Sequence, residues 1–213
     1  MINTIKEESL NLADGILCLD FTNTVGWHAS SKPVERLNTY TDLLNWSLEK
    51  GLISDQEADY LRQQASLHSD QAQAVLEHAI ELREAIYHIF LANINNMTAQ
   101  ATDLDVLNYW LQVGVLHLKI NSAEKGFAWN WSEDESSLDQ MLWWAALSAG
   151  RLLASENLAR VGECADERGC GWLFYDTSRN HSRRWCDMND CGNRAKSHRH
   201  YEKVQDLKLE KTA

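Results

Sequence analysis

The chain is poor in proline and glycine, with Pro33 as its one proline and ten glycines among 213 residues, and it has no internal repeat or low-complexity tract. It therefore has no evident linker before about residues 159–163. No apolar stretch approaches the roughly 20 residues that a membrane-spanning helix needs. The acidic N-terminus also lacks the basic and apolar regions of a secretory signal. We expect a protein of the reducing cytoplasm that has no membrane partner.

Familiar catalytic patterns are missing as well. The sequence contains no recognisable Ser-His-Asp arrangement, phosphate-binding loop, dinucleotide-binding glycine pattern or His-Glu-x-x-His helix. We therefore do not expect an enzyme.

Positive charge is scarce and unevenly placed. The net charge is −11, from 20 Lys and Arg against 31 Asp and Glu. Residues 1–159 hold 9 basic and 22 acidic side chains, whereas residues 160–213 hold 11 and 9. The C-terminal part therefore has a net charge of +2 beside an acidic body of −13. Such a patch can bind nucleic acid, or it can simply keep a small module soluble.

Four of the five cysteines form two close pairs near the C-terminus. Cys164 with Cys170 and Cys186 with Cys191 are separated by fifteen residues rich in aromatic side chains and arginine. Two short loops that each deliver two thiolates are typical of a structural zinc site, and four thiolates leave no open position for catalysis. Two disulfides are the alternative, which a reducing compartment disfavours. Candidate substitute ligands are His181, His198 and His200.

Hydrophobic periodicity and capping residues predict a mainly helical body. Residues 15–24 could form a short strand or a buried helical entry. We expect helices over about 39–50, from Ser54 onward, over about 72–94 and over about 102–114. A β-hairpin with strands at 115–120 and 127–131 should follow, and then a central helix capped by residues 132–135 and extending to Leu158.

The cysteine-rich segment predicts a small zinc module. Gly169, Gly171 and Gly192 should form tight turns at the metal. Residues 172–175 and 183–185 should pair as strands, and residues 193–209 should form a helix. Knuckle, hairpin, knuckle and helix is the order of a treble-clef finger. We therefore expect a mainly α protein with a small β-hairpin, divided into a helical domain at 1–159 and a zinc-finger domain at 160–213.

The body also offers a candidate pocket for a small-molecule effector. Asp20, Asn23 and His28 are the polar candidates, beside Trp27 and several other tryptophans. Such tryptophans more often simply form a helical core, and Asp20 could cap the loop that follows it.

Two segments resemble known families. The sequence from Cys186 to Lys196, CDMNDCGNRAK, resembles the signature of CGNR zinc fingers, as do residues 174–180 and 183–185. The segment 19–24, LDFTNT, followed by Tyr40, Asp42 and Trp46, resembles the ABATE domain. Five residues separate Cys164 from Cys170, where the resemblance implies four. It also implies a bacterial transcription regulator, in some members a stress-responsive one, whose finger binds DNA.

The basic residues of the finger are the candidates for DNA contact. We predict a nucleic-acid-binding surface formed by Arg179, Arg183, Arg184, Arg194, Lys196, Arg199 and Lys203. Arg194 and Asn193 could instead brace the zinc loops. One small finger on an acidic chain should need a second copy for useful affinity, so a homodimer is a hypothesis. The rival function is a zinc-containing adaptor that binds protein or RNA.

Overall fold

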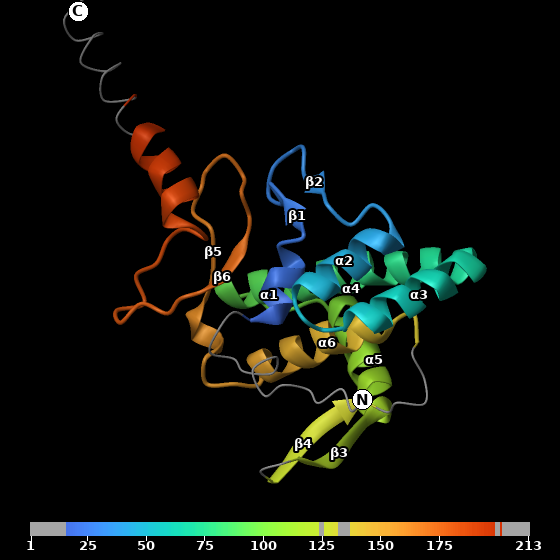
Figure 1. Cartoon of the computed structure of the whole chain (residues 1–213). Coiled ribbons are helices and arrows are strands. Elements are labelled where there is room, and N and C mark those ends of the chain that lie inside the picture. Colours follow the sequence, from blue (N-terminus) through green and yellow to red (C-terminus); the bar gives the residue numbers. More distant parts are fainter. Residues whose placement is uncertain (1–15, 124–125, 132–136, 199–200, 202–213) are drawn as a thin grey trace, which may run out of the picture.

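The structure is a computed structural model, and it describes residues 16–123, 126–131, 137–198 and 201. A helical body carries a smaller cysteine-rich unit on one side (Figure 1). The named α-helices are α1 (Leu17–Thr22), α2 (Tyr40–Glu49), α3 (Asp55–Leu67), α4 (Ser69–Ile94), α5 (Ala101–His117) and α6 (Gln140–Leu153). The strands form three antiparallel pairs: β1 (Val25–Gly26) with β2 (Val34–Glu35), β3 (Leu118–Ala123) with β4 (Gly126–Trp131), and β5 (Val161–Glu163) with β6 (Leu173–Tyr175). The expected mainly α fold is confirmed.

Two helices begin where the capping residues predict. The Thr39 hydroxyl accepts a hydrogen bond from the backbone N–H of Asp42, whose carboxylate accepts one from the Thr39 N–H. Ser54 and Glu57 form the same reciprocal pair before α3. These capping boxes satisfy N–H groups that a helix leaves without partners in its first turn.

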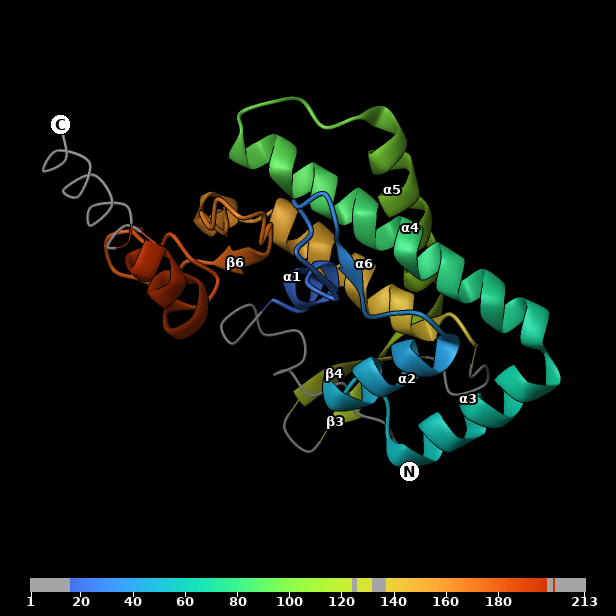
Figure 2. The ribbon, with the colours of Figure 1, turned by 90° about the horizontal axis from the view of Figure 1, so that it is seen from above.

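The core lies between α4, α5 and α6. The long helix α4 crosses the body, with α5 and α6 beside it and α1 packed against α6 (Figure 2). Phe21, Leu82, Ile86, Phe90 and Trp143 are fully buried there. The apolar repeat expected over 72–94 therefore covers one side of α4, and α1 is the buried helical entry.

The predicted boundaries after α5 are wrong by several residues. The helix continues past Gly114 to His117, because Gly114 lets α5 approach α6: a Cβ on Gly114 would lie 3.2 Å from the Cβ of Trp143. The first hairpin strand therefore begins at Leu118 and extends to Ala123, and the second strand begins at Gly126. Both strands include residues that were predicted to lie in a longer loop. The predicted cap at 132–135 lies outside the described residues. Helix α6 ends at Leu153, and Leu158 starts a 3₁₀ turn, Leu158–Arg160.

The predicted strand partner within the finger is also wrong. Strand β6 pairs with β5, which precedes the first cysteine, and Val161 lies opposite Tyr175. Residues 183–185 are not a strand, although the carbonyl of Arg184 accepts a hydrogen bond from the N–H of Ala165 at 2.8 Å. After a π-helical turn at Met188–Gly192, residues 193–198 are helical, and most of the predicted remainder to 209 lies outside the described residues.

Among the described residues, no helix combines the length and apolar character needed to cross a membrane.

Candidate metal centre and nucleic-acid interface

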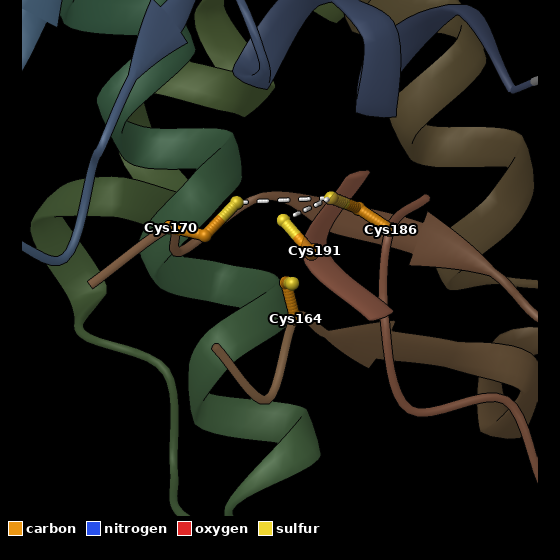
Figure 3. A group of neighbouring side chains, drawn as sticks. All are labelled: Cys164, Cys170, Cys186 and Cys191. Carbon is orange, nitrogen blue, oxygen red and sulfur yellow. Dashed lines mark hydrogen bonds between the residues drawn. The ribbon is translucent and has the colours of Figure 1, made fainter. Parts of the chain in front are cut away.

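The four predicted cysteines meet at one point. The sulfur atoms of Cys164, Cys170, Cys186 and Cys191 all lie within 4.8 Å of one another, and none forms a disulfide (Figure 3). The Sγ of Cys186 lies 3.7 Å from that of Cys170 and 3.6 Å from that of Cys191. Zn–S bonds of about 2.3 Å in a tetrahedron place sulfurs about 3.8 Å apart. The cluster therefore fits a structural Zn²⁺ site, and a bound ion would supply much of the folding free energy of this small unit.

The chemistry of the donors is also suited to a metal. Burial raises the pKa of the Cys191 thiol to about 12, while hydrogen bonds with Cys186 and Arg194 act in the opposite direction. Hydrogen bonds with Cys170 and Cys186 lower the pKa of Cys164. A metal cation would replace the thiol protons that remain and stabilise all four thiolates. Three of the four cysteines are buried, and Trp172 and Trp185 pack against them.

Arginines brace the cluster from outside. The guanidinium of Arg194 donates a hydrogen bond to the sulfur of Cys191 at 2.9 Å and pairs with Asp190 at 2.5 Å. Buried Asp166 accepts two hydrogen bonds from Arg168, at 2.9 and 2.8 Å, and lies 3.6 Å from Arg194. The Trp27 ring lies near both guanidinium groups, with its centroid 5.7 Å from the central carbon of the Arg168 guanidinium and 5.1 Å from that of Arg194. The Arg194 side chain therefore positions a ligand.

A local turn forms part of the connection from Cys164 to Cys170. The carboxylate of Asp166 accepts from the N–H of Arg168, and its carbonyl accepts from the N–H of Gly169. Gly169 and Gly171 adopt φ values of +93° and +67°, as expected for glycines that form tight turns.

The segment around the first cysteine pair, residues 164–171, is here called the first knuckle. It packs against residues 25–30 of the body, here called the docking loop. A Cβ on Gly171 would lie 2.6 Å from the backbone nitrogen of Ala29, and one on Gly169 would lie 2.8 Å from the Cα of Ser30. The N–H of His28 donates to the carbonyl of Cys170 at 3.0 Å. The finger thus has direct backbone contact with the helical body.

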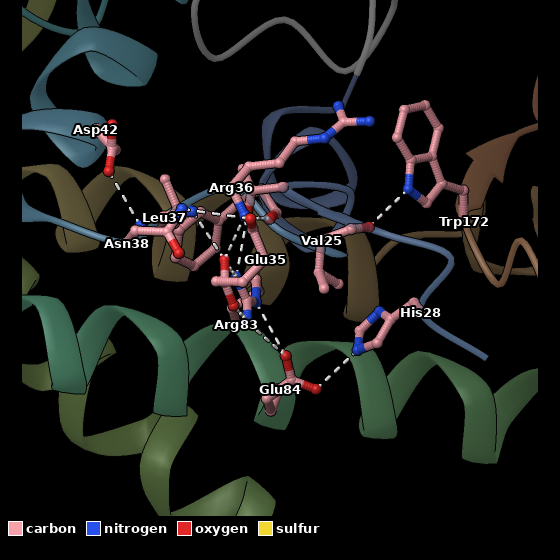
Figure 4. Close-up of polar contacts among 12 residues, drawn as sticks. Val25, His28, Glu35, Arg36, Leu37, Asn38, Asp42, Arg83, Glu84 and Trp172 are labelled. Atoms are coloured by element: carbon pink, nitrogen blue, oxygen red, sulfur yellow. Dashed lines mark hydrogen bonds and ion pairs between the residues drawn. The ribbon is translucent and has the colours of Figure 1, made fainter. Parts of the chain in front are cut away.

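A buried ionic network anchors the segment around the docking loop to α4. Arg83 is almost fully buried, and it donates to both carboxylate oxygens of Glu35, at 2.7 and 2.6 Å, and to Glu84 at 2.9 Å (Figure 4). The other oxygen of Glu84 lies 2.8 Å from Nε2 of His28, whose ring stacks on Tyr87. A chain of contacts therefore links α4 to the backbone of Cys170.

Two further contacts join body and finger at β6. The indole N–H of Trp172 donates to the carbonyl of Val25 at 2.7 Å. The amide of Asn23 exchanges hydrogen bonds with the backbone of Leu173, donating at 2.9 Å and accepting at 3.0 Å. Asn23 thus pairs with β6 much as a neighbouring strand would.

The three residues predicted for a pocket do not converge. Asp20 and Asn23 lie on an open groove of about 410 Å³, which Trp46, Arg36 and Trp172 also line. Asp20 forms an ion pair with Lys50 at 2.8 Å. His28 is not among the groove residues, because its ring is directed to Glu84.

The predicted nucleic-acid residues divide into two groups. Arg183 is committed to the finger: it donates to the carbonyls of Tyr175, Trp185 and Cys186. Arg194 braces the metal ligands, as described above, and Asn193 donates to the carbonyl of Asn189, so the bracing alternative describes their positions. Three cations are exposed and have no carboxylate partner among the described residues: Arg179, Arg184 and Lys196. Arg199 and Lys203 lie outside the described residues.

Several residues of the site were not identified from the sequence. Asp166 and Arg168 carry a weak signal, since opposite charges two residues apart lie between the first two ligands. Arg83 falls within the apolar repeat expected over 72–94, where a charged side chain is a weak signal of a buried ion pair, and Glu84 carries no signal. Trp27 was grouped with pocket aromatics, and its contact with two arginines depends on the approach of segments that are far apart in the sequence.

Comparison with family models gives two matches. Residues 160–204 match the CGNR zinc finger, and residues 15–156 match ABATE, described as "Putative stress-induced transcription regulator". A search among curated proteins finds no match. Both matched families are of regulator or zinc-finger type and neither is an enzyme family. The ABATE match covers well over half of the chain and the four-cysteine cluster lies within the second match, so the chain belongs to the ABATE family and carries a C-terminal CGNR zinc finger.

Proposed function

We propose that this protein is a cytoplasmic transcription regulator that binds DNA through its zinc finger and has no enzymatic activity of its own. The family description supports regulation, and the zinc site gives a small basic unit a fixed shape. Phosphate contacts from Lys and Arg supply much of the affinity of DNA-binding proteins. We assign fewer residues to DNA contact than the number of basic residues in the finger suggests.

The observation that carries the proposal is how the finger uses its cations. Arg183 and Arg194 hold the finger together, whereas Arg179, Arg184 and Lys196 are exposed and lack carboxylate partners among the described residues. On a chain of net charge −11, unpaired cations grouped on one small unit favour an anionic partner. Arg199 and Lys203, which lie outside the described residues, stay predicted DNA contacts on the basis of the sequence.

In this proposal the helical body has one of two roles: it binds a small-molecule effector, or it forms the contact between two copies of the chain. The groove beside Asp20 and Asn23 reaches Trp172, two residues after Cys170. A small molecule bound there would touch both the helical body and the finger, so it could alter how the finger is held. This groove is the candidate effector site.

A second candidate function is a zinc-containing adaptor that binds protein or RNA. Arg183 and Arg194 form hydrogen bonds within the finger, so fewer cationic side chains are left to contact bases. This smaller cationic surface favours the adaptor.

Binding of the zinc-loaded full chain to duplex DNA, to RNA and to an unrelated polyanion distinguishes the two. We expect tighter binding to duplex DNA, with a preference among sequences selected from a random pool. Equal affinity for all three polyanions, with no sequence preference, would contradict the regulator and favour the adaptor.

A further inference from the structure

The β3–β4 hairpin projects from the helical body (Figure 1). It bears exposed apolar side chains. Ile120 is 57% exposed and Phe127 is 75% exposed. Val115 and Leu116, at the end of α5 that leads into β3, are 58% and 81% exposed. Of the twelve large apolar side chains that are exposed among the described residues, five lie between Tyr109 and Phe127. Scattered exposed apolar residues are ordinary, but this concentration is not.

The strand register places Ile120 and Phe127 on one face of the hairpin. Ser122 lies directly opposite Phe127, and side chains two residues apart on a strand point to the same face. Ile120 is therefore a diagonal cross-strand neighbour of Phe127, within reach of an aromatic ring. Lys119 lies on the other face. The hairpin thus has an apolar face and a polar one.

Little within the described part of the chain supports this hairpin. Leu118 at its base packs with Leu17, Leu52 and Trp144. Among the residues that the structure describes, the two strands form a sheet with no third member. An isolated two-stranded hairpin is marginally stable in water, and a covered apolar face is what stabilises it.

We propose that the apolar face of this hairpin, with Ile120 and Phe127 at its centre, is the surface by which two copies of the chain form a dimer. Charge points to a second copy as the occupant. Residues 115–131 contain Lys119, Lys125 and Glu124, a net charge of +1, within a chain of net charge −11. Two copies repel each other over most of their acidic surfaces, and this segment is a place where they can meet without that penalty.

A two-fold axis suits such a face, because the same patch then covers its own equivalent on the other copy. The dimer would carry two fingers, although the inference stands on the apolar face and does not depend on DNA binding. One finger buries little DNA surface, so two fingers on one dimer would raise the affinity for paired sites.

Sedimentation equilibrium of the full zinc-loaded chain over a dilution series tests the proposal. We expect a dimer for the natural sequence and a dissociation constant at least about tenfold higher for Ile120→Glu with Phe127→Glu, since two acidic pairs would face each other across the axis. Leu67→Glu is the matched control, because Leu67 is 67% exposed at the end of α3, far along the chain from the hairpin. Lys119→Gln controls for changes on the polar face, and both controls should remain dimeric.

Hydrogen exchange of the natural sequence provides a readout without substitution. Backbone amides of residues 118–131 should become more protected as the protein concentration rises. A monomer at every concentration, or a dimer unaffected by the double substitution with unchanged exchange at the hairpin, would overturn the inference. A monomer that still binds duplex DNA would overturn it while leaving the proposed function intact.

Discussion

Arg83 is the residue on which the anchoring of the docking loop depends. It is buried between Glu35 and Glu84, whose side chains are each about one third exposed. Burial alone would raise the pKa of each carboxyl. For Glu35, the hydrogen bonds from Arg83 and from the N–H groups of Leu37 and Arg36 hold the pKa below its ordinary value of 4.5. For Glu84, the contact with His28 and then the charge of Arg83 do the same. Ionised Glu35 and Glu84 are therefore favoured in the folded state.

Replacing Arg83 by Met should lower the free energy of unfolding by about 3 kcal/mol, because the two partly buried carboxylates lose their cation. Urea unfolding followed by circular dichroism measures this. The contribution of a carboxyl with a lowered pKa is present above its ordinary value and is lost as the pH falls through the folded value. The natural protein should thus lose stability below pH 4.5, and the variant should lose less. Equal slopes in acid would contradict this role.

Arg194 positions Cys191, and its planar side chain contacts a thiol, a carboxylate and an indole at once. Arg194→Lys keeps the charge but not these simultaneous contacts, so zinc affinity should fall about 10- to 100-fold. Competition with a chromogenic chelator measures the affinity. Arg179→Lys is the control, since Arg179 is exposed and donates no side-chain hydrogen bond among the described residues. Similar affinities in the two variants would show that Arg194 does not act on the metal site.

The docking loop and the first knuckle depend on glycine for their contact. Gly171 and Gly51 have almost the same φ, +67° and +68°, but a Cβ on Gly171 would clash with Ala29, whereas one on Gly51 would meet nothing within 4 Å. Gly51→Ala should cost about 1 kcal/mol of backbone strain. Gly171→Ala should cost that amount and more, and it should weaken zinc retention. Thermal unfolding with and without a chelator compares them, and equal losses would mean that the contact is unimportant.

Local signals in the sequence predict where helices begin better than they predict which strands pair or which helices pack together. The capping boxes at Thr39 and Ser54 fix helix starts because both partners lie within three residues of each other. The sequence cannot place β6 beside β5, because that pairing closes around the first cysteine pair, and 183–185 has an equally suitable composition. Gly114 looks like a helix end until α6 is seen to pack on it. The four metal ligands were predictable from spacing, whereas the docking loop depends on long-range contact.

At the scale of the whole molecule, hydrogen bonds as well as the continuous chain hold the finger on the body. Cys186→Ser should release zinc and unfold the finger, because three thiolates hold the ion less well. The helical body should retain most of its circular dichroism signal but melt at a lower temperature, since the partners of Val25, Asn23 and His28 are lost. A variant that keeps one zinc ion per chain would contradict the ligand assignment, and an unchanged melting temperature would contradict the coupling.

The most direct test of DNA binding by the finger is the salt dependence of binding by the zinc-loaded full chain. Each phosphate-contacting cation that is removed should reduce the slope of log affinity against log salt concentration by about 1. We expect Arg184→Gln and Lys196→Gln each to have this effect, and Arg62→Gln on α3, which pairs with Asp59, to leave the slope unchanged. Slopes that are the same in all three variants as in the natural protein would contradict DNA binding by this surface.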